Sequence, residues 1–409
     1  MELNPFQERA VSTAGHCTVL ACPGSGKTRV LSERAIRLLT SHDKGRLCAV
    51  TFTRDAAAEL KSRILPSCKP DVGRRLAVGT FHSIALSQLK RLPRSIKPRR
   101  LLSEGERLAL LRRCLAEHPI AASFDDTLKF IDSAKARISP AIANDPELEM
   151  IYGIYQETLS SEDAMDFSDI VLSVVQKMHA QEMMPLPIRW LLVDEAQDMD
   201  EVQMEWVKAH GLAGIEVSLV GDDDQSLYAF RHAMGYLGLT DVSGTLVSTE
   251  TTLPLNYRCA PNILEHAAKL IAHNKLRAPK RIEAFRTSPG EVQVIRASDR
   301  WDEAELLLAR IRKLGLDAEW GILGRTNSML DPLEISLSGA NIPYRRTGGK
   351  RIWDQKLGST YLGILRSVFD GGWTGVANAL SFSGVAASSI NSRKIQTTGD
   401  CLSYLATIL

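Results

Sequence analysis

The sequence contains no long apolar segment. No run approaches the roughly 18 consecutive apolar residues that a membrane-spanning helix needs. Residues 1–5 are polar and lack the apolar region of a secretory signal. From these two absences we expect a cytoplasmic protein.

Cysteine is scarce and shows no paired spacing. The seven cysteines are Cys17, Cys22, Cys48, Cys68, Cys114, Cys259 and Cys401. The spacing argues against a structural zinc site and a disulfide framework, and it favours a reducing compartment. We expect Cys22, which lies in a glycine-rich segment, to pack against its neighbours.

Neither sign of charge dominates. Lys and Arg total 50 and Asp and Glu total 48, which gives a formal net charge of +2. Affinity for nucleic acid would therefore have to come from local patches. One basic stretch contains Lys90, Arg91, Arg94, Lys97, Arg99 and Arg100. It fits a nucleic-acid-binding surface and an ordinary solvated face equally well.

Short apolar runs alternate with longer helical patterns. The runs lie at 18–21, 48–52, 76–78, 190–193 and 217–220. Such alternation favours a parallel sheet flanked by helices. Between residues 84 and 165 the pattern is helix-rich without a strand-like run, which predicts a helical insertion. A second α/β set begins near Glu291, with strands expected at 292–295 and 320–323.

A glycine-rich segment separates the first apolar run from an amphipathic stretch at 29–39. It reads Ala21-Cys22-Pro23-Gly24-Ser25-Gly26-Lys27-Thr28. In a strand-loop-helix context such a segment wraps backbone N–H groups around a β-phosphate, the lysine reaches the β- and γ-oxygens, and the threonine hydroxyl holds Mg²⁺. The segment predicts a site for a nucleoside triphosphate. The alternative, a chance glycine-rich turn, does not explain the acidic motif downstream.

That acidic motif follows the apolar run at 190–193. Asp194 and Glu195 come directly after the run, and ligands of open α/β sheets bind at the carboxyl ends of the strands. We expect Asp194 to face the Mg²⁺ of Thr28 and Glu195 to polarise the water that attacks the γ-phosphate. The alternative is an acidic helix N-terminus, but a buried-type run is an unusual start for a solvated face.

Further blocks occur in the order typical of one family. They are Gln7, Val-Thr-Phe-Thr-Arg-Asp-Ala-Ala at 50–57, Gly-Thr-Phe-His-Ser at 79–83, Gly-Asp-Asp-Asp-Gln-Ser-Leu-Tyr-Ala-Phe-Arg at 221–231 and Leu-Asn-Tyr-Arg at 255–258. With these blocks the chain resembles the superfamily 1 DNA helicases of the UvrD/Rep type. Residues 324–327 and 342–349 resemble the start of the second motor domain of that family. The resemblance covers residues 1–355.

The resemblance implies roles in a nucleotide site. Gln7 would read the adenine edge, Tyr257 would stack on the base, and Arg29 would contact the nucleotide. Gln225 would sense the γ-phosphate, and Arg258 would neutralise the charge that develops on it, as an arginine finger does. For Gln7 and Tyr257 taken alone, capping and core packing are the alternatives.

The resemblance also implies a DNA site that tolerates any base sequence. Its aromatic members would be Phe52, Phe81, His82, Tyr228 and Phe230, on which bases stack. Its phosphate contacts would be Thr51, Thr53, Thr80 and Arg231. Because Tyr228 and Phe230 lie just after Gln225, they would link the nucleotide state to the grip on the strand. Core packing is the alternative for each aromatic residue.

The chain also departs from the family pattern. Cys22, Arg54, Ala196 and Phe230 stand where the family commonly has Gly, Asn, an aromatic residue and Trp. The later motifs, a histidine-containing block and a Thr-Arg-Ala block with a second arginine finger, are absent, and no histidine follows His273.

Together these observations predict an α/β chain with a P-loop RecA-like parallel sheet, a helical insertion and a second, incomplete RecA-like domain. We expect the first motor domain at 1–280 with its insertion at about 84–165, the start of the second at 281–370, and a partial accessory segment at 371–409.

The expected function is that of an ATP- and Mg²⁺-dependent motor that moves 3′→5′ on single-stranded DNA and acts on 3′-tailed duplexes. The direction follows from the resemblance alone. The alternative is a hydrolysis-impaired, ATP-gated DNA-binding subunit whose protein partner supplies the missing functions. A GTPase or small-molecule kinase is disfavoured, because no Asn-Lys-x-Asp guanine signature occurs.

Overall fold

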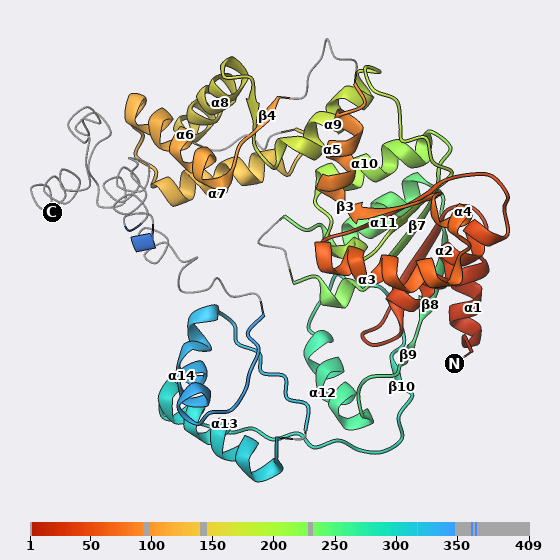
Figure 1. Cartoon of the computed structure of the whole chain (residues 1–409), viewed down its shortest axis with the longest axis vertical. Helices are drawn as coiled ribbons and strands as arrows, with labels where there is room; N and C mark the ends of the chain where they lie inside the picture. The colour runs from red at the N-terminus through yellow and green to blue at the C-terminus, as the bar shows by residue number, and fades with distance from the viewer. Residues whose placement is uncertain are drawn as a thin grey trace, which may run out of the picture. The chain divides into compact units, whose positions relative to one another are not determined.

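The structure is a computed structural model that describes residues 2–92, 99–139, 145–227, 232–316, 318–347, 361, 362 and 365. The chain divides into two compact units, Met1–Val292 and Gln293–Leu409. The first unit contains a large sheet with helices around it (Figure 1). Within the described residues, no helix combines the length and the apolar character needed to cross a membrane.

The centre of the first unit is a six-stranded parallel sheet. Its strand order is β3-β2-β6-β7-β1-β8, and every neighbouring pair is parallel. The strands are β1 Cys17–Ala21, β2 Leu47–Thr51, β3 Leu76–Thr80, β6 Trp190–Val193, β7 Glu216–Gly221 and β8 Thr249–Leu253. The five apolar runs thus become strands, which confirms the predicted α/β fold with a RecA-like parallel sheet.

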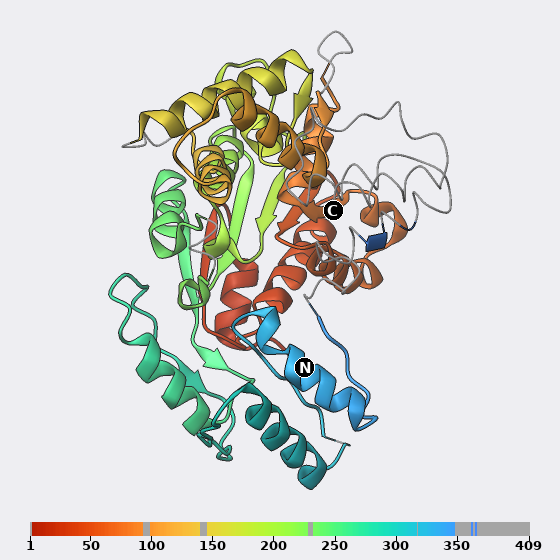
Figure 2. The same ribbon diagram turned by 90° about the vertical axis from the view of Figure 1, so that its left-hand side faces the viewer.

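Alternate residues of the strands pack into two cores, one on each face of the sheet. In β6, Leu191 and Val193 belong to one cluster, and Trp190 and Leu192 belong to the other, as the pleat requires. Helices α5, α9, α10 and α11 contribute to the first cluster, and α1, α2 and α3 contribute to the second (Figure 2). Because helices cover both faces, the strands read as continuous apolar runs.

The amphipathic stretch predicted at 29–39 lies within α2. The helices packed around the sheet or connecting its strands are α1 Pro5–Ser12, α2 Lys27–Thr40, α3 Arg54–Ile64, α4 Pro70–Gly73, α5 Phe81–Leu89, α9 Asp169–His179, α10 Glu201–Leu212, α11 Gly235–Thr245 and α12 Pro261–Ile271. A separate two-residue pair, β9 Leu255–Asn256 and β10 Glu283–Ala284, connects the chain on either side of α12.

The helical insertion has a core of its own. It contains α6 Glu104–Glu117, α7 Phe124–Lys135 and α8 Pro146–Ser161. Leu111, Ile131, Ile151 and Tyr155 are among the buried residues of this cluster. The sequence predicted no strand here, but Arg100–Leu101 (β4) pairs in parallel with Ala164–Met165 (β5). This pair is too short to produce a strand-like pattern, and it joins the two ends of the insertion.

A buried ionic cluster lies where the insertion meets α9. The Lys135 ammonium, at the end of α7, is fully buried and lies 2.7 Å from a carboxylate oxygen of Asp166 and 2.7 Å from one of Asp169. The Tyr155 hydroxyl donates to Asp166 at 2.9 Å. These contacts tie α7 and α8 to the start of α9, which packs against the sheet.

The described part of the second unit is helical. Helices α13 Arg300–Leu314 and α14 Asp331–Gly339 pack through a small cluster that includes Leu308 and Leu337. The strands predicted at 292–295 and 320–323 are not formed, and Leu323 is 98% exposed. An apolar run becomes a strand only beside a hydrogen-bonding neighbour, and the described residues of this unit contain no strand. The predicted segment 371–409 lies outside the described residues.

Candidate nucleotide and nucleic-acid site

The predicted phosphate loop connects β1 to α2. Gly24 and Gly26 have positive φ angles of 64° and 86°, which glycine adopts without a steric penalty. The Ser25 hydroxyl donates to the carbonyl oxygen of Cys22 at 2.7 Å and closes the turn. No side chain caps the N-terminus of α2. The first N–H groups of this helix can therefore bind an anion.

Cys22 packs as expected. Its side chain is buried, and burial raises the pKa of the thiol to about 11. The thiol therefore stays protonated at neutral pH and contributes shape to the loop.

A second segment, at the end of β8 and through β9, holds the loop from the other side. The side-chain amide of Asn256 donates to the Pro23 carbonyl at 2.6 Å, and the Tyr257 N–H donates to the Gly24 carbonyl at 3.0 Å. The Asn256 side-chain oxygen accepts from the backbone N–H of Arg258 at 2.9 Å. Arg258 is thereby placed beside the phosphate loop, with its side chain exposed. Sequence reasoning did not assign a role to Asn256.

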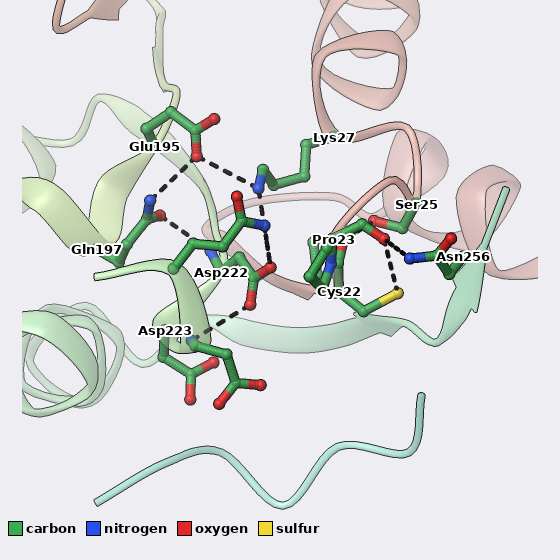
Figure 3. A network of polar contacts seen from close by, with 12 residues as sticks. Cys22, Pro23, Ser25, Lys27, Glu195, Gln197, Asp222, Asp223 and Asn256 are labelled. Atoms are coloured by element: carbon green, nitrogen blue, oxygen red, sulfur yellow. Dashed lines mark hydrogen bonds and ion pairs between the residues drawn. The ribbon is translucent and has the colours of Figure 1, made fainter. Parts of the chain in front are cut away.

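Lys27 lies between two carboxylates, as Figure 3 shows. Its ammonium is 3.4 Å from a Glu195 oxygen and 4.0 Å from an Asp222 oxygen. Gln197 connects the same two residues, because its amide donates to the Glu195 carboxylate at 3.1 Å and its oxygen accepts from the backbone N–H of Asp222 at 2.9 Å. The loops after β1, β6 and β7 are thus connected by one network of polar contacts.

The two acidic residues after β6 differ in backbone conformation and in burial. Glu195 has a left-handed backbone, with φ 48°, which is uncommon outside glycine and frequent at functional sites. Asp194 is buried, and burial together with the neighbouring Glu195 raises its pKa to about 6. A nearby cation would favour its ionised form.

Gln225 closes the network on the β7 side. It ends a short 3-10 helix, Asp223–Gln225, and its side-chain amide donates to the Asp222 carboxylate. Asp222 also pairs with Lys280, a residue that sequence reasoning missed. No motif marks Lys280, because it comes from a loop 58 residues further along the chain.

The residues expected to contact the base lie next to the loop. The buried side chain of Gln7 donates to the Ser25 carbonyl at 2.9 Å. The Tyr257 hydroxyl accepts from Asn4 at 2.6 Å. Arg29 is half-buried in the first turn of α2. Thr28 lies in the same turn and is also half-buried. The nucleotide roles of these residues remain predictions.

Two of the expected DNA contacts turn out to be core residues. Phe81 is only 2% exposed and packs edge-on against Phe52 and Trp206, with ring centroids 5.6 and 5.8 Å apart. Thr51 is buried, and its hydroxyl donates to the Thr53 carbonyl. A base or a phosphate cannot reach either side chain in this arrangement. The family block indicates where these residues lie in sequence, but it does not indicate which side chains point inward.

Thr53 and Thr80 cap the helices that follow β2 and β3. Each hydroxyl accepts from a backbone N–H of the first turn, of α3 and α5 respectively. A cavity of about 240 Å³ lies beside these helix starts, and Arg54, Lys61 and Thr80 contribute to its lining. Two cations and a helix N-terminus form a suitable environment for a phosphate.

His82 stacks on an aromatic residue that sequence reasoning missed. Its ring lies 4.0 Å from that of Phe167, with an interplanar angle of 16°. Phe167 is 53% exposed. Burial lowers the pKa of His82 to about 4, so the imidazole is neutral at physiological pH. The signal that the sequence offered for Phe167 was an aromatic residue in a polar segment, between Asp166 and Asp169. Tyr228, Phe230 and Arg231 lie outside the described residues.

Comparison with known proteins agrees with this geometry. The UvrD/REP helicase N-terminal domain matches residues 3–237, and the UvrD-like helicase C-terminal domain matches residues 251–370. DNA helicase II of Haemophilus influenzae is 30% identical over 398 residues, which cover 88% of this chain and 53% of that protein.

Two further relatives have similar coverage. ATP-dependent DNA helicase PcrA of Leuconostoc citreum is 29% identical over 384 residues, which cover 87% of this chain and 51% of that protein. PcrA of Staphylococcus aureus is 28% identical over 391 residues, which cover 90% of this chain and 53% of that protein. The chain spans about half the length of these curated relatives. Since the N-terminal domain match alone covers more than half of the chain, the chain belongs to the UvrD/REP helicase family.

Proposed function

We propose that this chain binds ATP with Mg²⁺ at the loop after β1, binds single-stranded DNA along the same edge of the sheet, and couples ATP hydrolysis to movement along the strand. The observation that carries the proposal is the convergence of Lys27, Glu195 and Arg258 on one loop from three separate elements. The DNA motifs follow β2 and β3, and the carboxyl ends of parallel strands share one edge.

Thr28 and Asp194 are the proposed Mg²⁺ ligands. A hydroxyl and a carboxylate are the hard oxygen donors that Mg²⁺ prefers. Asp194 is buried beside a second carboxylate, Glu195, so the site holds negative charge that a cation would offset. When bound, Mg²⁺ supplies charge neutralisation to the β- and γ-phosphates.

Hydrolysis would begin with an exchange of partners at Lys27. Its ammonium pairs with Glu195 in the structure. The triphosphate offers it a greater negative charge, so it turns to the β- and γ-oxygens and leaves the Glu195 carboxylate to polarise the attacking water. Gln225 then detects the γ-phosphate, and Arg258 neutralises charge that develops on it.

The β-phosphate and the base of the nucleotide would contact the phosphate loop and the residues beside it. The backbone of Cys22, Pro23, Gly24, Ser25 and Gly26 wraps the β-phosphate. Gln7 and Tyr257 face the base and Arg29 contacts the nucleotide, as the family resemblance implies. Gln7 and Tyr257 are already connected to the loop by hydrogen bonds, so base binding and phosphate binding would reinforce each other.

DNA would bind through phosphates at the helix starts and through stacking beside them. Thr53 and Thr80 would contact the phosphates of the DNA backbone. Arg54 and Lys61, the two cations that line the cavity, would contact the same phosphates. Phe52 and the stacked pair of His82 and Phe167 offer aromatic surfaces, together with the predicted Tyr228, Phe230 and Arg231. Stacking contributes about 1–3 kcal/mol per base with little sequence preference. Phe81 and Thr51 are not part of this proposal.

The proposed 3′→5′ direction and the proposed action on 3′-tailed duplexes rest on the resemblance to the family alone. The test is a DNA-stimulated ATPase assay on the purified chain, combined with unwinding of matched 3′-tailed and 5′-tailed duplexes. Turnover that rises with single-stranded DNA and unwinding restricted to the 3′-tailed substrate would support the motor. ATP binding that single-stranded DNA does not affect, together with no turnover, would overturn it.

A second candidate is an ATP-gated DNA-binding subunit with impaired hydrolysis. Tight, ATP-dependent binding of single-stranded DNA without turnover would favour it.

A further inference from the structure

Lys280 lies buried among three consecutive carboxylates. Its side chain is 2% exposed, and its ammonium is 2.5 Å from Asp222, 2.7 Å from Asp223 and 3.1 Å from Asp224. A further contact goes to the carbonyl oxygen of Ala21 at 2.9 Å. Ala21 is the last residue of β1 before the phosphate loop.

The carboxylates stabilise the charged form of Lys280 at this buried position. Burial by itself would lower the pKa of Lys280, but the attraction of Asp222 and Asp223 outweighs burial and raises it. The side chains of Asp222, Asp223 and Asp224 are inaccessible to solvent. Arg277 adds a second cation to the cluster, but it forms its two 2.8 Å hydrogen bonds with Asp224 alone.

Asp222 connects Lys280 to the nucleotide network. One of its carboxylate oxygens contacts Lys280. The other accepts from the Gln225 amide and lies 4.0 Å from Lys27. With one oxygen fixed by Lys280, the carboxylate presents the other to Gln225 in a single orientation. Without Lys280, the first oxygen would keep only its contact with the backbone N–H of Asp224, at 3.3 Å, and the carboxylate would be held less firmly.

We propose that Lys280 is a positioning residue for recognition of the γ-phosphate: it orients Asp222, which holds the amide of Gln225. The hydrogen bond from Lys280 to Ala21 fixes this arrangement relative to β1, the strand that leads into the phosphate loop. The inference rests on the proposed nucleotide site, in which Gln225 detects the γ-phosphate.

The course of the chain supports the same conclusion. The segment from Asn256 to Lys280 leaves the phosphate loop and returns to it, since Asn256 binds Pro23 and Lys280 binds Ala21. The arginine beside the loop and the residue that orients the sensor are therefore anchored at the two ends of one segment. A stability role alone would not require that both ends contact the residues flanking one loop.

The test compares two nucleotides that differ at the γ-position. Binding of ADP and of a non-hydrolysable ATP analogue to the full chain is measured by competition with a fluorescent nucleotide. For Lys280→Met, we expect ADP affinity to stay near the wild-type value and affinity for the analogue to fall about tenfold, as for loss of one hydrogen bond to a charged group. Arg277→Met, the matched control, removes a cation from the same cluster without touching Asp222, and both affinities should persist.

A double variant separates positioning from general stability. If Lys280 acts through Gln225, then Lys280→Met should cause no further loss of discrimination in a Gln225→Ala background, because coupled residues are non-additive. Independent, additive losses would overturn the proposal, and so would wild-type discrimination in Lys280→Met.

Thermal unfolding checks that the variant is folded. If Lys280→Met does not fold, Lys280→Arg replaces it, because the charge remains but the planar guanidinium cannot reproduce four contacts from one nitrogen. The same loss of discrimination is expected. If neither variant folds while Arg277→Met does, the role is in stability and the proposal fails. A wild-type chain that binds neither nucleotide would instead overturn the proposed function itself.

Discussion

A methyl group added to Gly24 would lie 2.6 Å from the β-carbon of Arg258. The phosphate loop and the segment that carries this arginine therefore meet where a side chain at position 24 does not fit. The closeness is maintained by the hydrogen bonds from Asn256 to Pro23 and from Tyr257 to Gly24.

The first prediction concerns this contact. Gly24→Ala should cost about 1–2 kcal/mol of folding free energy for the left-handed backbone, and it should also displace Arg258 and slow DNA-stimulated turnover by about tenfold or more. Gly15→Ala is the matched control, because Gly15 also has a positive φ, of 70°, but no atom lies within 4 Å of the added methyl. Equal turnover in the two variants would contradict the proposed position of Arg258.

The second prediction separates binding from hydrolysis. Lys27→Ala should abolish productive ATP binding, since Lys27 carries the phosphate charge. Glu195→Gln should retain ATP binding and lose turnover, because Glu195 acts on the attacking water. A fluorescent nucleotide and a phosphate-release assay measure the two effects. Unchanged ATP affinity in Lys27→Ala would be incompatible with the assigned loop.

The third prediction distinguishes core aromatics from DNA-binding aromatics. Phe81→Ala should destabilise the fold by about 3–5 kcal/mol, since the ring is buried. Phe167→Ala should leave stability nearly unchanged and weaken single-stranded DNA binding by about 1–3 kcal/mol, whatever the base composition. Denaturant unfolding and fluorescence anisotropy provide the measurements. The stacking proposal fails if Phe167→Ala binds DNA as tightly as the wild type.

The fourth prediction concerns pH. Burial lowers the pKa of His210 to about 4, below the value of about 6.5 in the unfolded chain. The stabilising contribution of the neutral imidazole is therefore complete above pH 6.5 and is lost as pH falls from 6.5 toward 4. His210→Gln should show a shallower decline in unfolding free energy over this window, measured with urea. His273→Gln changes an exposed histidine. Its unfolding free energy should decline with falling pH as steeply as that of the wild type.

The sequence was sufficient for five of the six strands of the sheet and for the phosphate loop, whereas β8 was not predicted. Continuous apolar runs such as 190–193 mark strands that are covered on both faces, and the glycines around Ser25 leave few alternatives for the turn that follows β1. These features depend on neighbours in sequence, so local pattern is informative.

Contacts between distant residues were not predictable in the same way. Asn256 and Lys280 reach Pro23 and Ala21 across 233 and 259 residues. The block at 255–258 marks Asn256 but does not indicate its partner, and no motif marks Lys280. Phe81 lies in a block associated with DNA contacts, yet its direction is decided by the packing of α5 on the sheet. Similarly, an apolar run such as 320–323 predicts a strand, but it cannot supply the neighbouring strand that it needs.

The buried ammonium of Lys135 limits how the helical insertion can be exchanged between relatives. Its charge is balanced by Asp166 and Asp169, which lie beyond the end of the insertion core at the start of α9. A graft that stopped at β5 would place this lysine opposite whatever side chains the recipient has there. An uncompensated buried charge destabilises a protein by about 3–5 kcal/mol. A segment exchanged between relatives would therefore have to extend beyond the insertion core and include the first turn of α9.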